Sequence, residues 1–70
     1  MMADRNWRDL TNEELRRETQ RIAINSTSQE EVGRKLKEKF DYPYPPAVCY
    51  GDRGQFMGMM HGKDGETIQF

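Results

Sequence analysis

The sequence predicts an α+β fold in which two N-terminal helices pack on a C-terminal three-stranded antiparallel meander, in the order α-α-β-β-β. Thr11–Glu14 and Ser28–Glu31 both have the spacing of a helix capping box. The composition changes abruptly after residue 41, where the prolines of Tyr42–Pro46 exclude a helix. Three short apolar runs separated by glycine-rich breaks follow, which is typical of strands joined by turns.

The two capping boxes fix where the helices begin. We expect the first helix at residues 12–24, with Leu10 and Leu15 forming a hydrophobic staple at its start, and the second at residues 29–40. Helical periodicity then places four side chains on the inner face of the first helix and three on that of the second. These are Leu15, Thr19, Ile22 and Ala23, and then Val32, Leu36 and Phe40.

We expect strands at residues 47–50, 55–61 and 67–70, in a register set by two turns. Asp64-Gly65 is typical of a two-residue type I′ turn, and Asp52-Arg53 is the expected tip of the first turn. This register gathers the bulky apolar side chains on the face that the helices should cover, namely Val48, Tyr50, Met57, Met59, Ile68 and Phe70. The uncovered face would carry Ala47, Cys49, Phe56, Gly58, Met60, Thr67 and Gln69.

Length and composition predict one small domain with a thin core. The chain has 70 residues, of which 34% are hydrophobic and 33% are charged. Residues 1–10 would form an arm, 11–40 the helical pair, 41–46 a connector and 47–70 the meander. A single cysteine excludes an internal disulfide, and a polar start without a long apolar run argues against a leader or a membrane span. We expect a cytoplasmic protein that does not interact with membranes.

The sequence indicates neither catalysis nor a metal site. His61 is the only histidine, and the predicted register places it away from Cys49. Four sulfur side chains near it would suit Cu(I), but that register puts Met57 and Met59 on the covered face, with Cys49 and Met60 on the other. We therefore expect no enzyme, no cofactor and no metal.

The uncovered sheet face is the strongest functional feature of the sequence. Phe56 and Met60 would lie exposed on it, and an exposed apolar patch on a small protein usually marks a contact site. Tyr42 and Tyr44 could extend the contact, and Trp7 is a further large side chain that the predicted core does not use. The hypothesis is a small accessory or regulatory domain that binds another protein or a second copy of itself.

The basic stretch of the second helix predicts an alternative. Arg34, Lys35, Lys37 and Lys39 would face DNA if this helix entered the major groove. Two helices followed by a hairpin, with Gly51–Gly54 as the wing tip, partly resemble a winged helix-turn-helix domain in their arrangement. A net charge of −1, and a short arm in place of the leading helix, argue against nucleic acid as the main partner.

Overall fold

The chain folds as two helices followed by a three-stranded antiparallel sheet, as predicted. The computed structural model describes residues 5–53 and 55–70, so the start of the predicted arm and Gly54 of the predicted wing tip lie outside the described residues. The main elements are α1 (Asn12–Ile24), α2 (Gln29–Phe40), β1 (Ala47–Tyr50), β2 (Phe56–His61) and β3 (Thr67–Gln69). A short 3-10 turn, Trp7–Asp9, precedes α1, and the tight turn Lys63–Gly65 joins β2 to β3.

Helix α1 begins at a complete capping box. The Thr11 hydroxyl accepts a hydrogen bond from the Glu14 amide at 3.0 Å, and the Glu14 carboxylate accepts one from the Thr11 amide at 2.9 Å. The bond from the Thr11 amide also lowers the pKa of Glu14. Leu10 and Leu15 are both buried, as the predicted staple requires.

Helix α2 begins at the predicted residue but with only half of the predicted box. The Ser28 hydroxyl accepts a hydrogen bond from the Glu31 amide at 3.2 Å. The Glu31 carboxylate, however, accepts from the Thr27 amide, one residue before the cap, at 2.8 Å. The helix ends at Phe40, and the left-handed backbone of the next residue, Asp41 (φ 55°), lets the Tyr42 amide donate back to the Leu36 carbonyl at 3.4 Å.

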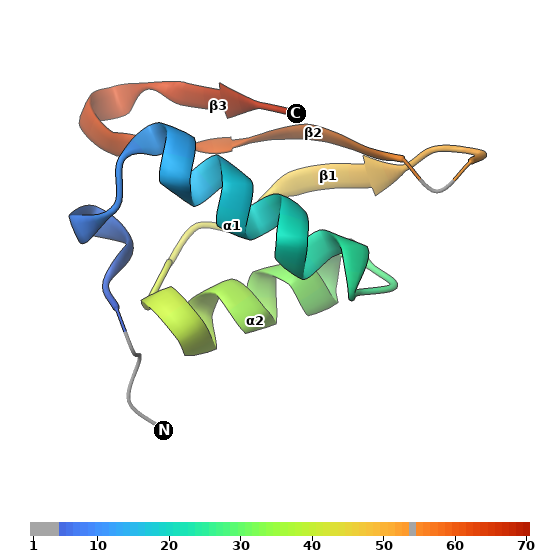
Figure 1. Ribbon diagram of the computed structural model, residues 1–70, viewed down its shortest axis with the longest axis horizontal. Helices are drawn as coiled ribbons and strands as arrows, with labels where there is room; N and C mark the ends of the chain where they lie inside the picture. Colours follow the sequence, from blue (N-terminus) through green and yellow to red (C-terminus); the bar gives the residue numbers. More distant parts are fainter. Residues whose placement is uncertain (1–4, 54) are drawn as a thin grey trace.

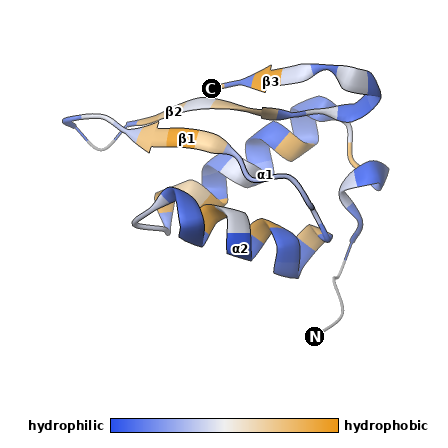
Figure 2. Cartoon of the chain, turned by 180° about the vertical axis from the view of Figure 1, so that it is seen from behind, coloured by the Kyte–Doolittle hydropathy of each residue, from blue (hydrophilic) through white to orange (hydrophobic). Residues whose placement is uncertain are grey.

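Both helices cover one face of the sheet, and the other face is open (Figure 1). The strand order is β1-β2-β3; α1 packs beneath β2 and β3, while α2 packs beneath β1. One helical layer packs on one sheet, in a molecule that measures 33 × 27 × 16 Å. Figure 2 shows hydrophilic and hydrophobic bands alternating along both helices, whereas most of β1 is hydrophobic.

The predicted strand register is wrong by one residue in both hairpins. Tyr50 pairs with Phe56, and His61 pairs with Thr67. Because side chains alternate between the faces of a strand, a slip of one residue moves every β2 side chain to the opposite face. The central strand therefore presents Phe56, Gly58 and Met60 to the helices, and Met57 and Met59 to the outside.

The slip in the second hairpin comes from a bulge. The predicted turn does form, because Asp64 and Gly65 have positive φ (58° and 76°) and the Glu66 amide donates to the Lys63 carbonyl at 3.0 Å. The Gly62 amide also donates to the Glu66 carbonyl, at 2.7 Å. Gly62 and Lys63 on one side of the hairpin therefore both lie opposite Glu66 on the other. This extra residue shifts all later pairs between β2 and β3 by one position.

The core lies between the helices and the inner face of the sheet. All seven helix residues predicted to point inward are buried. The main hydrophobic cluster holds six of these seven, without Thr19, and adds Leu10 of the staple, two sheet residues and two aromatic side chains, Trp7 and Tyr42. It contains Trp7, Leu10, Leu15, Ile22, Ala23, Val32, Leu36, Phe40, Tyr42, Met60 and Ile68.

Candidate functional site

The outer sheet face is a regular surface on which no charged side chain stands. We use this name for the outward residues of the three strands, all of which are exposed. They are Ala47, Cys49, Met57, Met59, His61, Thr67 and Gln69. Met57 and Met59 keep 48% and 47% of their surface accessible. In a chain that is 33% Asp, Glu, Lys and Arg, a whole sheet face without one of these residues indicates a surface suited to contact.

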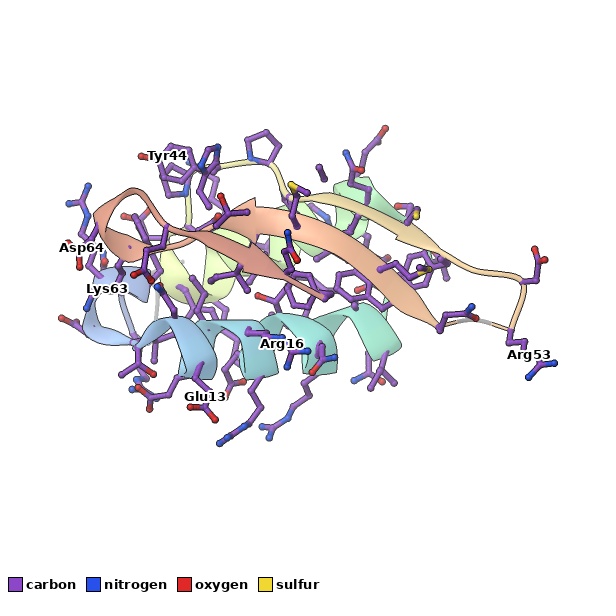
Figure 3. The ribbon with its side chains drawn as sticks, turned by 90° about the horizontal axis from the view of Figure 1, so that it is seen from above. Glu13, Arg16, Tyr44, Arg53, Lys63 and Asp64 are labelled. Carbon is purple, nitrogen blue, oxygen red and sulfur yellow. The ribbon has the colours of Figure 1, made fainter. Side chains whose placement is uncertain are left out.

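Charged side chains surround the outer sheet face but do not stand on it. Figure 3 looks down on the sheet and shows Glu13 and Arg16 on α1, and Arg53, Lys63 and Asp64 in the hairpin loops at the two ends. The face therefore has the arrangement of a protein interface, with an uncharged centre and a polar rim.

The two edges of the sheet are partly closed by side chains from the helices. On β1 the Val48 amide donates to the Gln29 side chain at 3.2 Å. On β3 the Gln69 carbonyl accepts from the Arg16 guanidinium at 2.9 Å. Because these groups would otherwise attract another strand, the open face of the sheet is a better contact surface than either edge.

Phe56 and Met60 are not on the outer sheet face, which corrects the prediction. Met60 is 3% exposed and belongs to the core cluster. Phe56 is partly buried against that cluster, with its ring 4.8 Å from that of Phe70. The one-residue slip of β2 is the reason, and it gives the outward positions to Met57 and Met59 instead.

The other predicted contact residues form an aromatic cluster at one end of the molecule. The Trp7 ring meets those of Tyr42 and Tyr44 edge-on, at 5.3 and 5.9 Å. The Tyr42 hydroxyl donates to the His61 carbonyl at 2.6 Å, and burial raises the pKa of Tyr42 to about 12. Trp7 and Tyr42 are buried, whereas Tyr44 is 41% exposed and lies 4.9 Å from the His61 ring. Only Tyr44 can extend the outer sheet face.

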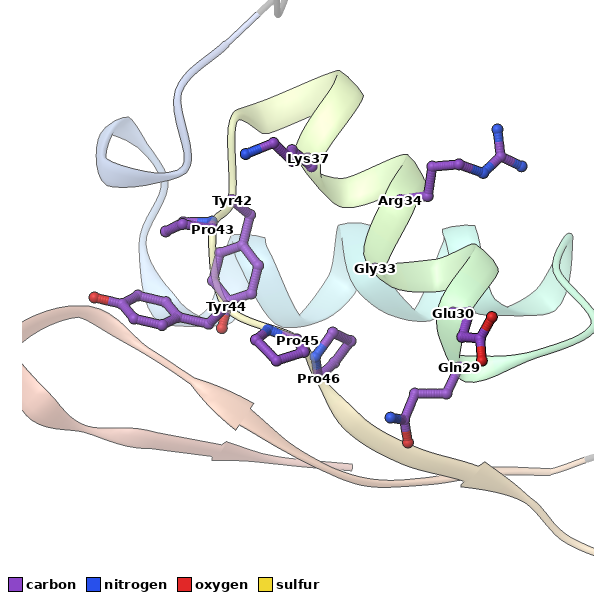
Figure 4. A pocket seen from close by; sticks show the side chains of 10 residues that line it. All are labelled: Gln29, Glu30, Gly33, Arg34, Lys37, Tyr42, Pro43, Tyr44, Pro45 and Pro46. Carbon is purple, nitrogen blue, oxygen red and sulfur yellow. The ribbon is translucent and has the colours of Figure 1, made fainter.

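A groove of about 450 Å³ lies between α2 and the Tyr42–Pro46 connector (Figure 4). Gly33 forms part of its wall, and a side chain at that position would begin 3.4 Å from Pro46. In Figure 4 the Arg34 side chain points away from the connector, and Lys37 extends above it. The full lining is Gln29, Glu30, Gly33, Arg34, Lys37, Tyr42, Pro43, Tyr44, Pro45 and Pro46.

Three of the four basic residues on α2 contact residues of the helix or of the turn before it. Arg34 pairs with Glu38 at 3.5 Å and with Glu31 at 4.0 Å. Lys35 pairs with Glu31 at 3.7 Å and donates to the Asn25 carbonyl at 2.9 Å. Lys39 lies over the Phe40 ring. These contacts are those of a solvated, salt-bridged helix face.

The corrected register brings together sulfur ligands that the sequence analysis separated. Cys49 is directly opposite Met57, and Met59 follows two residues later on the same face. Within residues 5–53 and 55–70, no three His, Cys, Asp or Glu side chains gather as a metal site would require. A group of ligands on this surface therefore has to include the thioethers.

Sequence reasoning missed Met57 and Met59 as surface residues, although one signal was present. Gly58 separates Phe56 from Met60, and a glycine offers no side chain to fill a core. The prediction of Met57 and Met59 as buried came instead from the register that the two expected turns imposed. Gly62, next to the Asp64-Gly65 turn, was the residue that could have signalled an extra position in the hairpin.

No protein-family model, no curated protein and no solved structure matches the chain. Among the described residues, no helix is long and apolar enough to cross a membrane.

Proposed function

We propose that this protein is a small protein-binding domain whose contact surface is the outer sheet face, and that its partner is a second copy of the same face. The observation that supports this most is the combination of two half-exposed methionines with the absence of charge across all three strands. The centres of protein interfaces are depleted in charged residues and enriched in methionine. Methionine also adapts its shape to whatever packs against it.

An uncharged face favours self-association for an electrostatic reason. In a two-fold dimer each surface meets its own copy, so a charge near the axis faces a like charge, and a charge elsewhere needs an opposite charge on the same surface. The outer sheet face has no such charge, and the two sheets could approach to the usual separation of about 10 Å. The helices would then form the outer layers of a four-layer dimer.

The size of the face indicates a reversible contact. Strands rise about 3.3 Å per residue and lie about 4.8 Å apart, so three strands of four, six and three residues present roughly 200 Å². A stable interface buries about 800 Å² per partner. Tyr44 adds to the area at one end, yet the dimer should still be weak. A weak and exchangeable contact suits an accessory or regulatory domain.

Sedimentation equilibrium over a wide range of chain concentration tests the proposal. We expect the apparent mass to rise with concentration, and we expect Met57→Glu with Met59→Glu to remain monomeric because two identical acidic patches would then face each other. Ile24→Glu is the matched control, since Ile24 is apolar and 80% exposed but lies at the end of α1. A wild-type chain that stays monomeric throughout, or a double variant that associates like the wild type, contradicts the proposal.

DNA binding through α2 remains the alternative. The ion pairs of Arg34 and Lys35 give it no added support. It predicts binding to random duplex DNA that weakens steeply with salt and is lost in Arg34→Glu with Lys37→Glu. The same charge reversal should leave self-association unchanged if the outer sheet face is the contact surface.

A further inference from the structure

The outer sheet face holds three sulfur atoms that can converge on one point. Cys49 on β1 pairs with Met57 on β2, and side chains at opposite positions begin about 4.5–5.5 Å apart. Met59 stands on the same face, diagonal to Cys49, at about 7–8 Å. Cys49 is a free, exposed thiol. Each methionine has three rotatable side-chain bonds, enough to bring its sulfur towards the cysteine.

Thiolate and thioether ligands are soft, and together they select Cu(I) over harder ions. We propose that Cys49, Met57 and Met59 form a three-coordinate binding site for Cu(I), with the Cys49 thiolate and the two thioether sulfurs as ligands. No cluster of carboxylates or imidazoles competes for this position in the described chain. His61 follows on the same face, but it lies two residues beyond Met59 and its ring packs against Tyr44.

Binding is an exchange of one cation for another. The Cys49 thiol releases its proton as its sulfur bonds to Cu(I), and the thioethers donate lone pairs without any change in charge. The bound thiolate and metal are neutral together, which matches a face that has no charged residue to balance an extra charge. No electron is transferred in this step.

This site shares a surface with the proposed dimer contact but needs only one chain. The two proposals can therefore be separated by a substitution that acts on one property alone. Leucine in place of Met57 and Met59 keeps the apolar surface and removes the thioethers. Glutamate at the same positions removes both, so it is used only to test the dimer contact.

Anaerobic titration with Cu(I), in competition with the chromophoric chelator bicinchoninate, tests the site at a chain concentration where sedimentation shows monomers. We expect one Cu(I) per chain and loss of binding in Cys49→Ser. Loss of even a group that only supports a ligand typically weakens metal binding about 10- to 100-fold. Met57 and Met59 are proposed as direct ligands, so Met57→Leu with Met59→Leu should weaken Cu(I) binding by at least about 10-fold. Met60→Leu is the matched control, since Met60 points into the core and should leave the affinity unchanged.

Three results would overturn the site. They are wild-type binding too weak to compete with the chelator, unchanged affinity in the double leucine variant, and an equal loss in Met60→Leu. Methionine methyl NMR adds an independent measurement, because Cu(I) is diamagnetic. The Met57 and Met59 methyl signals should shift on binding while that of Met60 does not. Sedimentation of the double leucine variant reports on the dimer contact separately.

Discussion

The two outward surfaces of this molecule carry different kinds of side chain. The helical layer presents charges that are paired along the helices, such as Arg17 with Glu13 at 3.4 Å and Arg34 with Glu38 at 3.5 Å. The outer sheet face presents none, and two methionines stand about half exposed on it. Surface ion pairs are well solvated and contribute little to stability, so the helical surface needs no partner. The sheet surface leaves apolar area in water, which is why we assign the contact to it.

The largest expected difference between the sheet and the helical layer is the effect on stability of replacing a glycine by alanine. A side chain at Gly58 would overlap the Ala47 carbonyl and lie 2.7 Å from the Val48 Cα, at a φ of +135°. Positive φ alone costs a non-glycine residue about 1–3 kcal/mol, so Gly58→Ala should lower the free energy of unfolding by more than about 3 kcal/mol. Gly33→Ala on α2, whose new methyl would meet only Pro46 at 3.4 Å, should instead raise it by up to about 1 kcal/mol.

Urea denaturation of both alanine variants measures this difference. If Gly58→Ala is as stable as the wild type, β1 and β2 do not approach each other as closely as described. If Gly33→Ala is destabilising, the helix and the connector are packed more tightly than the structure shows.

The next largest difference in stability is expected between alanine variants of two adjacent methionines on β2. Met60 is 3% exposed and Met59 is 47% exposed. Truncation of a buried methionine to alanine costs about 2–5 kcal/mol, whereas a surface truncation is usually within about 0.5 kcal/mol. We expect Met60→Ala to lower the urea midpoint strongly and Met59→Ala to leave it nearly unchanged. The opposite order would restore the register predicted from the sequence.

Tyr42 should make stability depend on alkaline pH. Burial raises its pKa from 10.0 to about 12 in the folded state. A phenol that holds its proton more tightly when folded contributes fully below the unfolded pKa, and that contribution is lost as pH rises from about 10 towards 12. We expect the urea midpoint to fall across this range, and to fall less in Tyr42→Phe. Tyr44→Phe is the exposed control, and an equal pH dependence in all three proteins would contradict the assignment to Tyr42.

The smallest difference in stability is expected between variants that remove the cap of α1 and the cap of α2. Thr11 takes part in both hydrogen bonds of a complete capping box, whereas Glu31 reaches past Ser28 to Thr27. Loss of a cap costs about 0.5–2 kcal/mol. Thr11→Ala removes the shorter hydroxyl bond, at 3.0 Å, and should fall in the upper part of that range, whereas Ser28→Ala removes the bond at 3.2 Å and should fall in the lower part, measured by urea denaturation. A larger loss for Ser28→Ala would contradict this order.

The helices could be predicted from the sequence because the signals that start them are local. Each cap lies within three residues of the group that it satisfies, and the inward positions follow from a fixed period. The strand positions were predictable for a similar reason, since prolines and glycines mark their ends. Nothing comparable marks the pairing of one strand with another.

The register depended on contacts from distant parts of the chain. The Asn12 side chain accepts a hydrogen bond from the Lys63 amide at 2.8 Å and donates to the Glu66 carboxylate, so the start of α1 holds the bulged loop in place. No pattern around residues 62–66 shows that Asn12 will be there. The surface assignment of Met57 and Met59 followed from the register, and so it could not be predicted either.

A dilution series followed by methionine methyl NMR tests the central claim, that the outer sheet face is the contact surface. Met57, Met59 and Met60 are reporters on one strand, with two pointing outward and one inward. We expect the Met57 and Met59 methyl signals to shift as the chain is concentrated, while the Met60 signal and the amides of α2 stay constant. Shifts centred on Arg34 and Lys37, or no change at any concentration, would contradict the account.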